Sequence, residues 1–103
     1  DPAIPELNAQ PVVRDKTRLC VGAALRVSPF DWNAPVPENA LLLSCDPVAL
    51  DTVARDILVR QIEAVGRAAG AAVEGSHHLA TAQAMQLGAT EPTLIDLREV
   101  ILA

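Results

Sequence analysis

The sequence predicts an α/β fold: a small, mostly parallel sheet of about three strands with two main helices, forming part of a larger α/β protein. An apolar run at 39–44 that does not alternate is typical of a strand buried on both faces. A long amphipathic pattern follows it directly, and a further apolar run lies at 98–102. Strands that flank helical crossovers are expected to be parallel, with a right-handed connection.

The composition predicts one domain with an aliphatic core. Half of the 103 residues are hydrophobic, and Phe30 and Trp32 are the only aromatic ones, so aliphatic side chains must supply the packing. The chain starts at Asp1 without a methionine and stops at Ala103, directly after an apolar run. We therefore expect the C-terminal part of a longer protein, although terminal strands also occur in complete domains.

The charge balance argues against nucleic acid and membrane partners. The formal net charge is −5, and the one group of basic residues, Arg14, Lys16 and Arg18, is interrupted by Asp15. Binding to phosphates requires a clustered basic face, and no apolar run approaches the roughly 20 residues that span a bilayer. The partners that remain are a second copy of the chain, in a homo-oligomer, or a missing upstream domain.

The first part of the chain is expected to hold short helical turns, one strand and a loop. Pro5 and Pro11 can each occupy the first position of a short helical turn. A partly alternating apolar pattern predicts a strand at 18–25, although its small residues weaken the pattern. Residues 28–38 hold three prolines, which predicts an extended loop. Its aromatic pair either contacts a ligand or partner, or pins the loop to the core.

A capped helix is expected to begin after Asp46. This residue offers a side-chain acceptor at the N-cap, and Pro47 has the preset φ favoured at the first helical position. The helical pattern holds until Gly66 or Gly70. On a helical wheel the apolar arc comprises Val53, Ala54, Ile57, Leu58, Ile62 and Val65, and the polar side comprises Thr52, Asp56, Arg60, Glu63 and Arg67. Asp51 falls at the edge of the apolar arc, where a carboxylate needs a hydrogen-bond donor, a cation or water.

A second helix is expected at 77–87, between a cap at Ser76 and a terminating Gly88. Its first two residues are His77 and His78. Adjacent helical side chains point about 100° apart, so the pair cannot chelate one metal ion as an i, i+4 pair can. Either both histidines are exposed or half-exposed, or one of them acts as a ligand or acid–base group.

The two cysteines, Cys20 and Cys45, are too few for a disulfide framework and lack the spacing of a zinc site. Two small, mostly buried thiols are the expected arrangement. A single disulfide is the alternative if the strands that carry them are neighbours.

A candidate site lies where the central strand meets the helix. Ligands of parallel sheets collect beyond the carboxyl ends of the strands, which here means Ser44, Asp46 and the helix N-terminus. The N–H groups of that terminus favour an anion, whereas two nearby carboxylates favour a cation, and this conflict argues against a simple phosphate cradle. The candidate ligand-binding residues are therefore Ser44, Asp46, Asp51 and His78. Asp51 is the best candidate metal ligand, and no cofactor is indicated.

Residues 39–51, NALLLSCDPVALD, resemble the signature of an uncharacterised bacterial and archaeal family called domain of unknown function 362. That family shows a strand ending in Ser/Thr-Asp-Pro-Val-Ala and an aspartate in the following helix, which Asp46 and Asp51 match. The segments at 19–26 and 78–88, together with Trp32, are similar to its first strand, second helix and loop. The resemblance implies no established reaction. Some members look exported by the twin-arginine route and some are fused to iron–sulfur modules, which leaves cytoplasm and periplasm both open.

The chain departs from the family pattern at three positions. Ala23 stands where the family carries a first-strand aspartate, Cys45 where threonine is common, and Ala89 where a second Leu-Gly step is typical. If that first-strand aspartate forms a site with the residues matched by Asp46 and Asp51, the site in this chain lacks one carboxylate, because Ala23 replaces it.

Two functions from different classes follow. In the first, the chain is a structural or interaction segment of a larger α/β protein, in which Asp46 only caps a helix and Asp51 bonds to protein donors with no cavity beside it. In the second, it is part of an enzyme or redox protein that binds a cation or small polar ligand near Asp46 and Asp51. We expect the first for this segment, because Ala23 removes one site residue. The surroundings of the Asp51 carboxylate distinguish the two.

Overall fold

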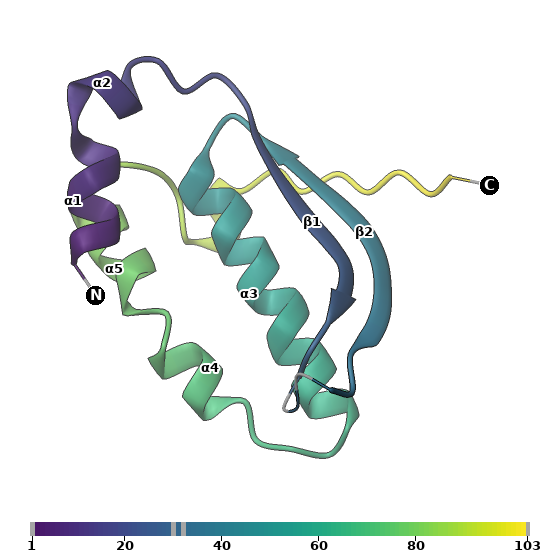
Figure 1. The fold of residues 1–103 in the computed structure, drawn as a ribbon. Coiled ribbons are helices and arrows are strands. Elements are labelled where there is room, and N and C mark those ends of the chain that lie inside the picture. Colours follow the sequence, from purple (N-terminus) through teal and green to yellow (C-terminus); the bar gives the residue numbers. More distant parts are fainter. Residues whose placement is uncertain (1, 30, 32, 103) are drawn as a thin grey trace.

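One long helix lies between a two-stranded sheet and a layer of shorter helices (Figure 1). The computed structural model describes residues 2–29, 31 and 33–102. In chain order the elements are α1 (Ala3–Ala9), α2 (Pro11–Arg14), β1 (Cys20–Val27), β2 (Val36–Ser44), α3 (Pro47–Ala64), α4 (Gly70–Glu74), α5 (His77–Ala84) and a 3₁₀ turn at Pro92–Leu94. The sheet packs on one side of α3, and α4 and α5 pack on its other side. α1 packs against α5.

The sheet is antiparallel, so the prediction of a mostly parallel sheet of about three strands is wrong. Cys20 pairs with Ser44 at one end of the sheet, and Val27 pairs with Val36 at the other. The connection at 28–35 is too short for the crossover of a dozen or more residues that parallel strands require. The chain therefore turns back directly, and the helices precede or follow the two strands instead of separating them.

The predicted strand at 98–102 does not form within the part of the chain that the structure describes. Residues 95–102 run out past the sheet without pairing with either strand (Figure 1). Val100, Ile101 and Leu102 are almost fully exposed. An apolar run becomes a strand only where a pairing edge is available, and this segment meets none.

β2 begins inside the predicted loop, so Pro37 belongs to an edge strand, where proline is tolerated. Side chains alternate along β2: Leu41 and Leu43 face solvent, while Leu42 lies on the side that faces α3. The expectation of burial on both faces is wrong, because in the described residues helices cover one face only.

The predicted cap of α3 is confirmed. Asp46 Oδ1 accepts hydrogen bonds from the backbone N–H groups of Val48 and Ala49 at 2.8 and 2.9 Å. The helix ends at Ala64, and Gly66 follows with a φ of +75°, a conformation that favours glycine. The local signals for this helix therefore predict its start and its end.

The placement of Thr52 on the polar side of α3 is wrong. Its residue surface is 2% exposed, and its hydroxyl donates to the Val48 carbonyl at 2.8 Å. Because α3 packs against the sheet on one side and against α4 and α5 on the other, its buried surface is wider than one apolar arc. The hydroxyl is tolerated there because a carbonyl one turn earlier accepts its hydrogen bond.

A buried apolar cluster joins α3 to α5. Val48, Leu79 and Ala82 are buried together, and Leu87 packs against them. Ser76 lies directly before α5, as predicted, but its side chain does not cap this helix. Its hydroxyl donates instead to the Ala72 carbonyl of α4 at 2.7 Å.

Within the described residues, no helix is both long and apolar enough to cross a membrane. Phe30 and Trp32 lie outside the described residues, so the expected role of this aromatic pair stays a prediction.

Candidate functional site

The turn between β2 and α3 is held by its own polar groups. Ser44 Oγ accepts a hydrogen bond from the Asp46 backbone N–H at 2.9 Å. Beyond its capping bonds to α3, Asp46 accepts a hydrogen bond at Oδ2 from the backbone N–H of Ala89 at 2.9 Å. Three backbone donors therefore satisfy the Asp46 carboxylate within the protein. Ser44 and Asp46 stabilise the turn, and the N-terminus of α3 already holds a carboxylate.

Gly88 allows the chain after α5 to approach this turn. A Cβ atom at this position would lie 2.7 Å from both Asp46 Cγ and Val48 Cβ, which is too close for any side chain. Gly88 was expected to end the second helix, yet α5 ends at Ala84, and Gln86 adopts the left-handed conformation with a φ of +58°. The need for glycine at position 88 therefore comes from close packing.

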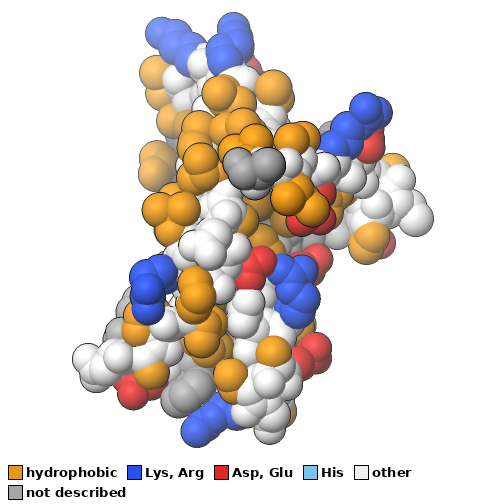
Figure 2. All heavy atoms as spheres, turned by 90° about the vertical axis from the view of Figure 1, so that its right-hand side faces the viewer, with side chains coloured by type: hydrophobic (Ala, Val, Ile, Leu, Met, Phe, Trp, Pro, Cys, Tyr) orange, Lys and Arg blue, Asp and Glu red, His pale blue; other side chains and the backbone are white. Residues whose placement is uncertain are grey.

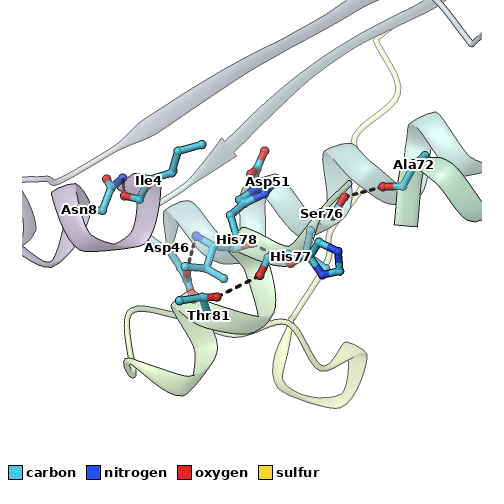
Figure 3. Close-up of polar contacts among 11 residues, drawn as sticks. Ile4, Asn8, Asp46, Asp51, Ala72, Ser76, His77, His78 and Thr81 are labelled. Carbon is cyan, nitrogen blue, oxygen red and sulfur yellow. Dashed lines mark hydrogen bonds and ion pairs between the residues drawn. The ribbon is translucent and has the colours of Figure 1, made fainter. Parts of the chain in front are cut away.

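Asp51 and His78 face each other across the gap between α3 and α5 (Figure 3). His78 Nε2 lies 2.6 Å from Asp51 Oδ2, a distance typical of a charge-assisted hydrogen bond. The Asp51 side chain is 52% exposed and the His78 side chain 22% exposed, so solvent reaches the carboxylate while most of the ring is covered. Among the described residues, His78 is the single hydrogen-bond partner of Asp51, and Asp51 Oδ1 has none.

A cavity of about 450 Å³ opens beside this pair. Its walls come from α1, α2, the start of β1, the first turns of α3, and α5. Val48, Leu79 and Ala82 are buried and form an apolar base. Asp51 and His78 belong to the polar part of the wall. The cavity therefore combines an apolar floor with one half-exposed carboxylate.

The structure brings three of the four predicted site residues to this cavity: Asp46, Asp51 and His78 line it, and Ser44 does not. Sequence reasoning missed Arg14, whose position on the wall depends on how α2 packs and has no signal in the sequence.

The two cysteines also line the cavity and were missed as site residues. They come together because β1 and β2 are neighbours, which places Cys20 opposite the residue before Cys45. Both thiols are free. Cys20 is half-buried and Cys45 is exposed, so the expectation of two mostly buried thiols is wrong for Cys45. Cys45 lies in the turn between β2 and α3, where no other element of the described chain covers it.

The described residues do not supply the donor set of a metal centre. No group of three or more His, Cys, Asp or Glu side chains converges among them. Asp51 and His78 bond to each other and offer two donors at most. The role of Asp51 as a metal ligand therefore stays a prediction.

Comparisons of the chain with protein-family models, with curated proteins and with solved structures found no match. The resemblance of residues 39–51 to the family called domain of unknown function 362 stays a prediction.

Proposed function

We propose that this domain binds a small organic molecule in the cavity between α1, α3 and α5, with Asp51 as the polar anchor. The observation that carries the proposal is the Asp51–His78 pair on the wall of a cavity of about 450 Å³. Pockets for small ligands are roughly 300–1,000 Å³, mostly apolar, with a few fixed polar groups. A purely structural Asp51 was expected to have no cavity beside it, so this observation favours the ligand-binding function.

The chemistry of the cavity supports binding by two complementary contacts. The apolar floor of Val48, Leu79 and Ala82 favours the apolar part of a ligand, at about 0.8 kcal/mol for each methylene group buried. The free oxygen of Asp51 accepts a hydrogen bond from the polar part. His78 holds the carboxylate in one orientation, which reduces the side-chain entropy lost on binding. The resemblance of residues 39–51 to the family named above adds support, since its motif includes the positions of Asp46 and Asp51.

The proposal is tested by titrating the ¹⁵N-labelled domain with a set of fragment-sized organic compounds and following the backbone amide signals. Compounds that bind should shift the signals of Leu50, Leu79 and Ala82, which line the cavity. Asp51→Ala should weaken that binding about two- to tenfold, because it removes one half-exposed hydrogen bond that contributes about 0.5–1.4 kcal/mol. It should lower the free energy of unfolding by no more than about 1 kcal/mol, because the bond between Asp51 and His78 is half-exposed.

The matched control is Glu63→Ala, an exposed acidic residue near the other end of the same helix. It should change neither the binding nor the fold. The proposal fails if no compound shifts the cavity signals, or if the compounds bind Asp51→Ala as well as the unmodified domain.

The outward face of the sheet favours a second function, association with another protein surface. Val21, Leu25, Leu41 and Leu43 are each more than half exposed on this face. Figure 2, which views the molecule from the sheet side, shows hydrophobic side chains gathered over it. These four positions carry no charge, so they can meet their counterparts in a second copy without repulsion despite a net charge of −5. Arg26, which pairs with Pro37 near the other end of the sheet, is the exposed charge beside them in the described part of β1. We infer that the partner is the same face of a second copy, since sheets pack face to face about 10 Å apart.

A further inference from the structure

The positively charged side chains around the cavity already have acidic partners. Arg14, on the cavity wall, bonds to Asp15 at 3.0 Å. Arg55, one turn after Asp51 on α3, bonds to Asp56 at 2.8 Å. Each guanidinium is thus neutralised by the carboxylate next to it in the chain.

The negatively charged side chains on the wall differ in this respect. Asp46 is satisfied by three backbone N–H groups. Asp51 has only the imidazole of His78, which bonds to Oδ2 and leaves Oδ1 without a partner among the described residues. Asp51 is therefore the carboxylate on this wall that keeps a free oxygen in the part of the chain that the structure describes.

From this balance we propose that the cavity takes a small organic ammonium ion, a primary amine with an apolar body. The ammonium group donates to Asp51 Oδ1, the oxygen that His78 leaves free, and the apolar body lies on Val48, Leu79 and Ala82. This inference rests on the proposed function, because it names the class of ligand for the same cavity.

Two other ligand classes fit the described residues less well. An anion would meet the N–H groups at the start of α3 or the guanidinium of Arg14, but the N–H groups of Val48 and Ala49 already donate to Asp46, and Arg14 pairs with Asp15. A metal ion would need at least three converging donors, which the described residues do not provide. An ammonium ion needs one free carboxylate oxygen and an apolar floor, and both are present.

The test uses three probes of one size and shape that differ in charge: benzylamine, benzyl alcohol and benzoate. Each is titrated into the ¹⁵N-labelled full chain under the same buffer conditions. Benzylamine should bind about fivefold more tightly than benzyl alcohol, the ratio that corresponds to roughly 1 kcal/mol for a half-exposed ion pair. Benzoate should bind most weakly. The signals of Leu50, Leu79 and Ala82 locate the binding.

Asp51→Asn is the matched variant, because asparagine keeps an acceptor for His78 Nε2 and removes only the charge. It should reduce the affinity for benzylamine to that for benzyl alcohol, while Glu63→Gln, which removes an exposed charge near the other end of α3, should leave the affinity for benzylamine unchanged. The comparison of the three probes on the unmodified domain stands even if Asp51→Asn fails to fold.

Each remaining outcome is decisive. If the three probes bind in the cavity with equal affinity, or benzoate binds most tightly, the preference for an ammonium ion is wrong and the proposed function still holds. Should Glu63→Gln weaken the binding of benzylamine as much as Asp51→Asn does, the effect is one of overall charge and the preference is again wrong. If no probe shifts the cavity signals at concentrations up to about 10 mM, where even weak small-ligand binding is detected, both proposals fail.

Discussion

Asp46 and Asp51 belong to the same turn-and-helix unit, yet the protein surrounds their carboxylates in opposite ways. Asp46 is enclosed by backbone N–H groups from α3 and from the segment after α5. Asp51 meets solvent and a single imidazole. A carboxylate enclosed by donors stabilises the fold, whereas one with a free oxygen is available to a ligand.

Asp46→Ala should lower the free energy of unfolding by about 2.5–4 kcal/mol. Loss of the helix cap contributes about 1 kcal/mol, and loss of the charge-assisted hydrogen bond to Ala89 about 1.5–3 kcal/mol. Urea denaturation followed by circular dichroism measures the change. Asp56→Ala, which removes an exposed aspartate from the same helix, should stay within about 0.5 kcal/mol of the unmodified domain. Equal losses in the two variants would contradict the role of Asp46.

The sequence predicts Asp46 well, because a helix cap involves only neighbouring residues. It also predicts that Asp51 needs a partner, but it does not identify that partner. His78 lies 27 residues further along the chain and reaches Asp51 because α5 returns along α3. The periodicity of one helix contains no information about which helix packs beside it, so this half of the site could not be predicted.

At the scale of whole elements, the sequence predicts features that depend on local residues and misses those that depend on a packing partner. α3, which is buried on two sides, shows the first case. Its start and end follow from local chemistry at Asp46 and Gly66. The apolar run at 39–44 predicts a strand correctly, but hydrophobicity alone does not show whether each face of a sheet is covered. The run at 98–102 fails for the same reason, because strand formation depends on a partner elsewhere in the fold.

Leu41 and Leu42 are adjacent in β2 and should respond very differently to the same change. Leu42→Thr removes an apolar side chain from the face that packs on α3 and should lower the free energy of unfolding by about 1.5–3 kcal/mol. Leu41→Thr changes a residue that is 65% exposed and should stay within about 0.5 kcal/mol of the unmodified domain. Threonine suits a strand at either position, so propensity cancels in the comparison. Denaturation curves that coincide for the two variants would show that the assigned faces are wrong.

The three layers of the molecule are covered unequally: α3 is enclosed, whereas the sheet presents an apolar face to solvent (Figures 1 and 2). Burying several half-exposed aliphatic side chains from each copy contributes about 1–2 kcal/mol per side chain. Association itself costs about 4–15 kcal/mol. The balance predicts a weak, reversible dimer instead of an obligate one.

Sedimentation equilibrium over protein concentrations from about 10 μM to 1 mM should show this self-association. Leu41→Lys places a charge at the centre of the face and should weaken it at least about tenfold. Val73→Lys makes the same change at an exposed apolar residue of α4, away from the sheet, and should have no effect. A domain that stays monomeric at the highest concentration, or equal effects of the two lysines, would exclude the sheet face as a dimer interface.

The hydrogen bond from Ala89 to Asp46 also governs how the chain assembles over time. It joins residues 43 positions apart, so the cap of α3 is complete only after α4 and α5 have formed and returned to the start of the helix. Closing a loop costs entropy that rises slowly with length, by about 0.6 kcal/mol for each doubling, whereas distant contacts slow folding markedly. A longer connection between α3 and α4 would therefore leave the equilibrium nearly unchanged and lengthen the search for this contact. We therefore expect the length of this loop to affect the folding rate more than the stability of the folded domain.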